Sequence, residues 1–333
     1  MNSEFIVLVI SGGKEEAEIS KISASFITKK LDKININYET TCLNDYSSLN
    51  VLIQQLPTKF NPEKTYVIPC IHGAPGESGE IQALLSEAGY SYLGCDSDSS
   101  MTCFDKITTK LKTSKLGIPI VPFQRLKYET KLSTEHIRKV HQFFNDNGRR
   151  IFIKSPRQGS SIGCYEVRSP EEIEVTIKKC SAYGHEILIE KAISGREIEV
   201  ATFEFKQELH ISDPGEILTE GEFYNYDNKY SEKSKVKASI SPTIDEKLKK
   251  QLCSFCAILF RELGLKDLSR IDFFLENETN KIYLNEINTF PGMTPISLFP
   301  LLVEGYGVKF EDFLKDRLIQ NNLEAKGKIY ENN

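Results

Sequence analysis

Residues 5–13 have the sequence FIVLVISGG, an apolar run that ends at a serine and two glycines. A run of this length and composition is typical of a strand buried on both faces. Apolar strands and amphipathic helices continue to alternate through the first third of the chain, with a helix at 15–31, a strand at 66–69, a helix at 81–88 and a short strand at 90–93. This order predicts a parallel sheet with helices on its faces, the α/β class.

Two loops follow strands of this predicted sheet, at 11–16 and at 72–79. Ligands of open parallel sheets bind beyond the carboxyl ends of the strands, so both loops are candidate binding elements. His72 opens the second loop beside a glycine, where a substrate-facing role and a structural turn position are equally compatible with it. We find no His/Cys metal constellation and no nucleophile elbow in the sequence.

Composition excludes several classes of protein. The 333 residues, 40% of them hydrophobic, fit a globular chain of two or three domains. Lys and Arg total 42 against 47 Asp and Glu, a net charge of −5 without a dense basic cluster, so no nucleic-acid partner is expected. No apolar stretch approaches the roughly 18 residues of a membrane span, and no basic region precedes the first apolar run. These features predict a cytoplasmic protein without membrane association, whose eight cysteines are reduced thiols.

The rest of the chain differs from the first third. Between 104 and 193 we expect helices at 107–116 and 134–147, an apolar run at 118–123, and strands at 151–154, 163–167 and 187–190. Beyond 194 we expect further strands, a polar stretch at 219–237, a helix at 245–263 and a hairpin. The prediction is therefore three lobes, an α/β domain at 1–103 and two subdomains of α/β or α+β type at 104–193 and 194–333.

A glycine- and serine-rich turn at 157–163, RQGSSIG, joins two of these predicted strands. Glycines let backbone N–H groups approach phosphate oxygens, and the hydroxyls add donors. The turn is not a P-loop, because it lacks the Gly-Lys-Ser/Thr ending and the helix that follows. The turn alone is equally typical of a plain hairpin, but Lys154 at the end of the preceding strand favours an anion site, since a buried lysine needs a partner.

The segment 270–288 carries the sharpest chemical signal. Arg270 and Asp272 share one face of an alternating strand, and a second run follows after a polar turn. If the two runs pair as a hairpin, Asp272 falls opposite Glu286, with Asn288 two residues farther along the same face. Two carboxylates and an amide oxygen are suitable ligands for a Mg²⁺ ion that also binds the phosphates of a nucleotide. The alternative interpretation is that these residues form only an exposed polar face of the strand.

Several motifs stand in a fixed order along the chain. They are Gly12-Gly13 with Glu16-x-Glu18-Ile19-Ser20, His72-Gly73 with Gly76-Glu77-x-Gly79, Asp105-Lys106, Lys154 with Gly159-Ser160-Ser161-x-Gly163, Glu190 with Gly195-x-Glu197, Lys229-Tyr230, Arg270-x-Asp272, Glu286-x-Asn288, and Pro291-Gly292-Met293-Thr294 with Ser297-Leu298. Together they resemble the D-alanine–D-alanine ligase family of the ATP-grasp superfamily. The resemblance covers most of the chain, from Val7 to about Pro300.

The resemblance implies a three-lobed ATP-grasp architecture, in which a Rossmann-like N-terminal domain precedes two subdomains that bind the nucleotide between them. It implies ATP-dependent ligation of two D-alanines to D-alanyl-D-alanine through an acyl phosphate, for peptidoglycan precursor synthesis. The implied cofactors are ATP and two Mg²⁺ ions, with Mn²⁺ as a substitute, and the implied assembly is a homodimer. One alternative is a related ligase whose second substrate is D-serine, D-lactate or another amino acid, and another is a nucleotide-binding protein without catalysis.

The resemblance also implies which residues bind the nucleotide and the metal ions. Asp272, Glu286 and Asn288 would coordinate the ions. A larger set would bind the nucleotide: Lys106 and Lys154 at the phosphates, Ser161 in the covering loop, Glu190, Lys191 and Ile193 at the adenine, and Glu197 at the ribose. Lys229 belongs to this set as well, and the polar stretch at 219–237 that contains it fits a mobile lid.

The residues implied for catalysis form two groups. Arg270 and the Gly292 N–H would stabilise the negative charge of the tetrahedral intermediate. Glu16, Ser160 and Tyr230 would form a hydrogen-bonded chain that closes the loops over the site, and Glu16 would also bind the ammonium of the first D-alanine. Closure matters because water hydrolyses an acyl phosphate.

The substrate carboxylates have separate implied partners. His72 would lie near that of the first D-alanine, whereas Ser297 and the Leu298 N–H would hold that of the second. The chain departs from the family pattern at Ala192, where an aromatic residue often flanks the adenine, and at Ser78, which replaces an acid of the second loop.

Overall fold

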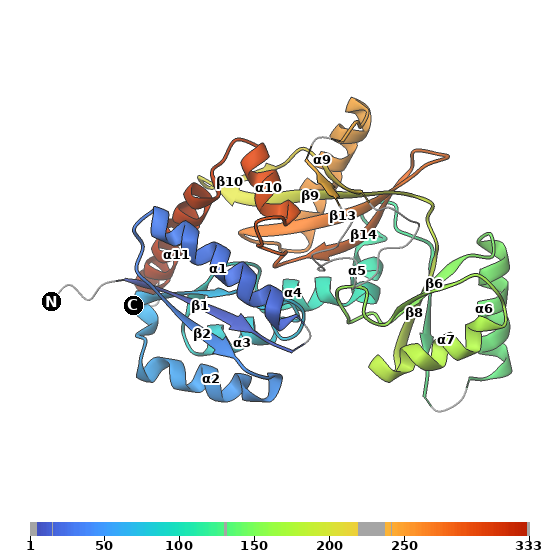
Figure 1. Ribbon diagram of the computed structural model, residues 1–333, viewed down its shortest axis with the longest axis horizontal. Coiled ribbons are helices and arrows are strands. Elements are labelled where there is room, and N and C mark those ends of the chain that lie inside the picture. Colours follow the sequence, from blue (N-terminus) through green and yellow to red (C-terminus); the bar gives the residue numbers. More distant parts are fainter. Residues whose placement is uncertain (1–4, 15, 130–131, 219–236, 241, 332–333) are drawn as a thin grey trace.

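The computed structural model describes residues 5–14, 16–129, 132–218, 237–240 and 242–331. Three β-sheets organise this part of the chain, and Figure 1 shows them as separate layers. The strands of each sheet fall wholly within one of the three predicted ranges. The predicted mixture of a parallel α/β domain and further mixed lobes is confirmed, while the domain boundaries themselves stay predictions.

The first sheet is parallel throughout, with the strand order β2-β1-β3-β4. Its strands are β1 (Ile6–Gly12), β2 (Tyr38–Leu43), β3 (Thr65–Pro69) and β4 (Ser91–Tyr92), and the helices of this part are α1 (Ala17–Lys33), α2 (Leu49–Gln55), α3 (Glu80–Glu87) and α4 (Ser97–Phe104), with 3₁₀ turns at Tyr46–Ser48, Leu56–Thr58 and Pro62–Lys64. Val7 and Val9 of β1 enter one apolar core, and Leu8 and Ile10 enter another. Strand β1 is therefore buried on both faces, as its unbroken apolar sequence predicts.

The second sheet is antiparallel, with the order β5-β8-β6-β7. This part comprises β5 (Phe123–Lys127), β6 (Ile151–Lys154), β7 (Cys164–Val167), β8 (Glu186–Lys191), α5 (Lys106–Thr113), α6 (Thr134–Asp146), α7 (Glu172–Cys180) and a 3₁₀ turn at Ser181–Tyr183. One face packs on α6 and α7 around a core that includes Phe144, Ile153 and Ile177. Because side chains alternate along a strand, Phe152 and Lys154 point away from this core.

The third sheet is also antiparallel, with the order β12-β11-β9-β13-β14 and with β10 beside β9. This part comprises β9 (Gly195–Phe205), β10 (Glu208–Ile211), β11 (Gly215–Leu218), β12 (Lys237–Ser239), β13 (Leu268–Glu276), β14 (Ile282–Asn288), α9 (Glu246–Glu262), α10 (Leu298–Gly305) and α11 (Phe310–Glu331). The predicted hairpin is confirmed, with Asp272 directly opposite Glu286. A bulge after Asp272 inserts Asn285, so that Asn285 and Glu286 both line one cavity between the second and third sheets.

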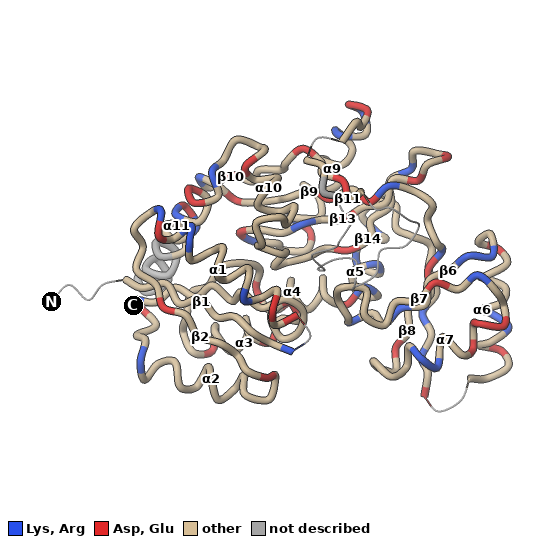
Figure 2. Tube along the Cα trace, in the orientation of Figure 1, with Lys and Arg blue, Asp and Glu red and all other residues tan. Residues whose placement is uncertain are grey.

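The first and third sheets share one apolar core, which includes Val7 of β1, Phe203 of β9 and Phe313 of α11. The amide of Asn321 on α11 also donates to the Tyr66 hydroxyl of β3 at 2.7 Å. The second sheet has a separate core and stands at the other end of the molecule in Figure 1, beyond α5. Figure 2 shows positions of Lys and Arg and of Asp and Glu along the backbone of all three layers. None of the described helices combines the length and the apolar character that a membrane span needs.

Candidate nucleotide and substrate site

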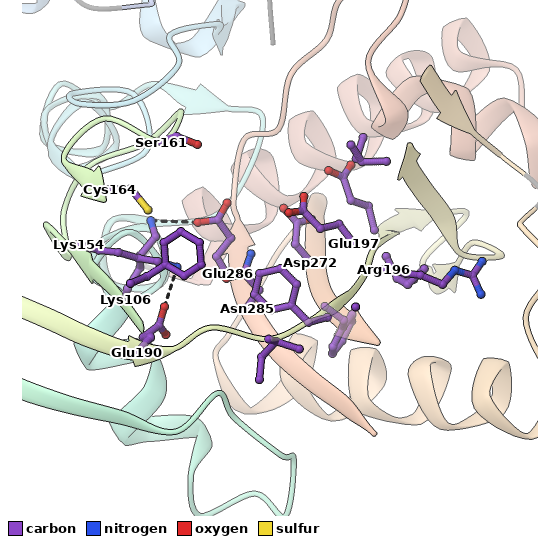
Figure 3. A pocket seen from close by; sticks show the side chains of 18 of the residues that line it. Lys106, Lys154, Ser161, Cys164, Glu190, Arg196, Glu197, Asp272, Asn285 and Glu286 are labelled. Carbon is purple, nitrogen blue, oxygen red and sulfur yellow. Dashed lines mark ion pairs between the residues drawn. The ribbon is translucent and has the colours of Figure 1, made fainter. Parts of the chain in front are cut away.

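A cavity of about 500 Å³ lies between the second and third sheets. Its walls come from β6 and β8 on one side, from β9, β11, β13 and β14 on the other, and from the 158–162 segment (Figure 3). Many of the residues selected from the sequence line it, namely Lys106, Lys154, Ser160, Ser161, Glu190, Lys191, Ile193, Glu197, Arg270, Asp272 and Glu286. The cavity therefore gathers residues from all the nucleotide motifs that fall within the described chain.

A second, smaller cavity of about 70 Å³ adjoins the loops of the first sheet. The selected residues that line it are Glu16, His72, Lys106, Ser160, Arg270, Glu286, Asn288 and Gly292. Four of these line both cavities, namely Lys106, Ser160, Arg270 and Glu286. A group bound in the small cavity consequently lies next to a group bound in the large one, which is the arrangement that transfer between two substrates requires.

Two lysines share one buried carboxylate at an end of the large cavity. The Nζ atoms of Lys110 and Lys154 lie 2.5 and 2.6 Å from the two carboxylate oxygens of Glu190. Burial raises the pKa of Glu190, but the two ammonium groups outweigh it and lower that pKa to about 2. The sequence expectation that Lys154 needs an anionic partner is met by Glu190. Lys110, whose pKa is lowered by burial, was not selected from the sequence.

The 157–163 turn folds over the junction of the two cavities. Ser160 and Ser161 adopt left-handed backbone conformations with φ of 49° and 62°, which are unusual for serine. The Ser160 hydroxyl donates to the Glu16 carboxylate, and the carbonyl of Gln158 accepts from the Lys106 ammonium at 3.0 Å. Lys106 also lies 3.0 Å from Glu286, so the turn, α5 and the hairpin meet at one lysine.

The hairpin presents its polar face to the cavities. The Arg270 guanidinium donates to both Asp272 oxygens at 2.8 Å, and the Asn288 amide donates to one of them at 2.9 Å. Burial alone would lower the pKa of Arg270, but Asp272 and Glu199 raise it, so the guanidinium stays charged. Within the described chain no three His, Cys, Asp or Glu side chains have metal-site geometry, and the candidate magnesium ligands on the hairpin are two carboxylates and an amide.

His72 is buried in the wall of the small cavity. Its Nε2 lies 2.8 Å from the Ser23 hydroxyl, and its backbone N–H donates to the Ser20 hydroxyl at 3.1 Å. Burial lowers the pKa of His72 to about 4, so the imidazole is neutral near pH 7. Glu77, which the motif contained but to which no role was given, faces it with 3.9 Å between Oε1 and Nδ1.

The turn before α10 is only partly connected with these cavities. Gly292 lines the small cavity, and a Cβ at this position would lie 2.9 Å from the Ser297 hydroxyl oxygen. Ser297 precedes α10 and accepts from the Thr294 N–H at 3.0 Å. Ser297 and Leu298 are not among the lining residues of either cavity.

Two selected residues, Lys229 and Tyr230, lie outside the described residues. Ala192 is buried and does not line the large cavity; the aromatic side chains that the described residues contribute to its lining are Phe152, Phe273 and Phe274. The sequence reasoning missed Phe152, although the alternation of β6 puts it on the same strand face as Lys154.

Comparison with known proteins gives consistent results. The family model described as "D-ala D-ala ligase C-terminus" matches residues 113–320. A protein of Vibrio atlanticus named D-alanine–D-alanine ligase is 39% identical, over 95% of this chain and 98% of its own length.

The fold is likewise similar to solved structures. The D-alanyl-alanine synthetase A of Vibrio cholerae superposes with a TM-score of 0.84 at 35% identity, covering 97% of this chain and all of the other. The D-Ala:D-Ser ligase VanG of Enterococcus faecalis gives a TM-score of 0.77 at 25% identity, covering 96% of this chain and all of the other. The similarity thus extends over nearly the whole chain, which includes all three sheets.

Proposed function

The chain belongs to the D-alanine–D-alanine ligase family, and from this we propose how its residues divide the work of joining two D-alanines. The enzyme is an ATP-dependent ligase of ATP-grasp fold whose product is D-alanyl-D-alanine, and the expected family and fold are confirmed. The observation that carries the residue assignments is the shared wall of the two cavities.

The reaction needs two coupled displacements. A carboxylate oxygen of the first D-alanine attacks the γ-phosphorus of ATP, the bond to the ADP oxygen breaks, and an acyl phosphate forms. The amine of the second D-alanine then attacks the acyl carbon, phosphate leaves, and the nitrogen gives up a proton to form the peptide bond. Positioning and charge neutralisation supply most of the catalysis in phosphoryl transfer, which fits a site built from lysines, an arginine and carboxylates.

The nucleotide occupies the large cavity in this proposal. Lys106 and Lys154 bind the phosphates, and Ser161 belongs to the turn that covers them. The adenine and ribose are bound by Glu190, Lys191, Ile193 and Glu197, with Lys229, which lies outside the described residues, as a further contact. The proposal is supported by the position of the described members of this set in one cavity between two sheets.

Asp272, Glu286 and Asn288 are proposed to hold two Mg²⁺ ions, or Mn²⁺ in their place. The donor set fits, because carboxylate and amide oxygens are the hard ligands that Mg²⁺ prefers, and the strand register puts all three on one face. When bound, the ions neutralise charge on the transferring phosphoryl group. Asp272 accepts hydrogen bonds from Arg270 and Asn288, and Glu286 is paired with Lys106, so these neighbours set the orientation of both carboxylates.

The small cavity is proposed to bind the amino acids. Glu16 binds the first ammonium and is oriented by the Ser160 hydroxyl, with Tyr230 completing the closure of the loops. Arg270 and the Gly292 N–H stabilise the oxyanion of the tetrahedral intermediate, because both line this cavity.

The remaining substrate contacts involve the carboxylates. His72 contributes as a neutral hydrogen-bonding group to the first, since its pKa is about 4. Ser297 and the Leu298 N–H, which lie at the start of α10 and line neither cavity, are proposed to hold the second. We also propose that the enzyme acts in the cytoplasm on peptidoglycan precursors and assembles as a homodimer.

The decisive experiment measures phosphate release from ATP and Mg²⁺ with D-alanine, L-alanine, D-serine or D-lactate, and identifies the product by mass. We expect release with D-alanine and a D-alanyl-D-alanine product. D-serine is included because VanG is named a D-Ala:D-Ser ligase. A mixed product would show that the second substrate is not D-alanine alone and would favour the alternative of a related ligase. Chelation of divalent ions should abolish release, and persistence of activity would refute the proposed metal requirement.

A further inference from the structure

Three carboxylates stand in one row across neighbouring strands of the third sheet. Strand register pairs Asp272 of β13 with Glu199 of β9 on one side and with Glu286 of β14 on the other. Residues directly opposite one another on adjacent strands point to the same face. All three carboxylates accordingly line the large cavity. Glu199 was not selected from the sequence, whereas the other two were.

Arg270 is held by two members of this row. Its Nε and Nη2 donate to the two oxygens of Asp272 at 2.8 Å, and its Nε lies 3.0 Å from Glu199 Oε2. The side chains of Arg270 and Glu199 are only 16% and 12% exposed. A buried ion pair of this kind costs desolvation energy and is not by itself a source of stability, so its presence beside the reacting groups calls for a functional reason.

We propose that Glu199 is a positioning residue, which keeps the Arg270 guanidinium directed at the reacting carbon when Asp272 binds a divalent cation. This inference rests on the roles proposed above for Arg270 and Asp272. A cation on Asp272 competes for the lone pairs that Arg270 now uses, and its charge repels the guanidinium. Glu199 is the second carboxylate in contact with Arg270; its strand β9 lies on the other side of β13 from β14, which carries Glu286, and Glu199 is not among the proposed metal ligands.

The first test uses Glu199→Gln, which keeps the shape of the side chain and removes the charge. We expect kcat to fall roughly 10- to 100-fold while the KM for ATP changes less than about threefold, because Arg270 acts on charge that develops during reaction. The matched control is Glu204→Gln, which alters another glutamate of β9 that faces an arginine, Arg317, but lines neither cavity. Its kcat should remain within about twofold of the wild type.

A double-mutant cycle separates this role from an independent one. In an Arg270→Ala background, Glu199→Gln should reduce kcat by less than about twofold, since the group it positions is gone. Losses that multiply would overturn the inference. An Arg270→Ala enzyme with wild-type kcat would instead overturn the role proposed for Arg270, which makes the two failures distinguishable.

A binding measurement gives a readout besides activity. Mn²⁺ titration of the enzyme–ADP complex, followed by electron paramagnetic resonance, should show several-fold weaker binding in Glu199→Gln, because Arg270 then depends on Asp272 alone. Unchanged Mn²⁺ affinity would contradict the inference. If Glu199→Gln does not fold, Glu199→Asp retains the charge at a longer distance, and its kcat should fall below that of the wild type. A kcat for Glu199→Asp equal to the wild-type value would refute the positioning role.

Discussion

The Lys154 ammonium lies 2.6 Å from one oxygen of Glu190, and the Lys110 ammonium lies 2.5 Å from the other. The Lys110 side chain is 2% exposed and that of Lys154 is 13% exposed, so Lys154 is the one that lines the cavity. Lys110 therefore pairs with Glu190 from the protein interior, on the side away from the cavity. If Lys154 binds a phosphate, as proposed above, Glu190 keeps Lys110 as its partner and no buried carboxylate is left unpaired.

This relationship predicts the effect of Lys110→Met. Without Lys110, Glu190 keeps Lys154 as its only cation, and the nucleotide must compete with a buried ion pair. We expect the KM for ATP and the dissociation constant of ADP to rise roughly tenfold, with kcat at saturating ATP nearly unchanged. Calorimetry and steady-state kinetics measure both quantities. The control is Lys112→Met, on the exposed face of the same helix, and equal losses of kcat and affinity would refute the prediction.

Arg270→Ala should lower kcat and leave the affinity for the nucleotide nearly unchanged, the reverse of the effect expected for Lys110→Met. Arg270 is a donor in the wall shared by both cavities, and removal of one such donor to a developing oxyanion costs about 10²- to 10³-fold in rate. We expect kcat to fall by that factor while ADP affinity changes only a few-fold. Equal losses in nucleotide affinity and turnover would place Arg270 in ground-state binding instead.

Local patterns in the sequence were sufficient for the elements with strong periodicity. Strand β1 and the β13–β14 hairpin follow from their patterns, and the register of Asp272 with Glu286 was predicted from spacing. Strand β2 was missed because its edge position leaves half of its residues exposed and removes the apolar signature. The apolar run at 118–123 contributes only Phe123 to β5, since it contains two prolines that cannot donate to a ladder.

Residues that act through tertiary partners were harder to find. Glu199 gains its significance from Asp272 on a strand about 70 positions away, and no local pattern contains that pairing. Lys110 was within reach of sequence reasoning, because it lies four positions after Lys106 on a helix and so shares its face. Its partner Glu190 comes from the second sheet, and only the folded chain brings them together.

The lowered pKa of His72 predicts a specific acid dependence of stability. Its pKa is about 4 in the folded protein, against 6.5 for an ordinary histidine, because burial disfavours the charged form. Between these values the unfolded chain binds more protons at His72, so the contribution of this histidine to stability is fully present above pH 6.5 and decreases by about 3 kcal/mol as the pH drops to 4. Melting temperatures of His72→Asn should depend less steeply on pH across this window. The exposed His136→Asn serves as control, and parallel profiles for all three proteins would contradict the prediction.

The contribution of Glu77 to stability should depend on pH in the opposite direction to that of His72. Burial, together with the negative charge of Glu16, raises the pKa of Glu77 from 4.5 to about 8. The folded protein therefore binds the extra proton on Glu77 between pH 4.5 and 8, and the contribution of Glu77 to stability declines through this window as the pH rises.

Glu77→Gln imitates the protonated side chain, so it should match the wild type near pH 5 and exceed its stability near pH 8 by on the order of 4 kcal/mol. Thermal unfolding at both pH values measures the difference, and Glu80→Gln provides an exposed carboxylate of the same helix region as control. Identical pH profiles for Glu77→Gln and the wild type would mean that Glu77 ionises normally in the fold. The expected difference would instead establish that Glu77 carries a proton 3.9 Å from His72, in the wall of the small cavity. The first D-alanine is proposed to bind in this cavity, and its positively charged ammonium group would favour loss of that proton.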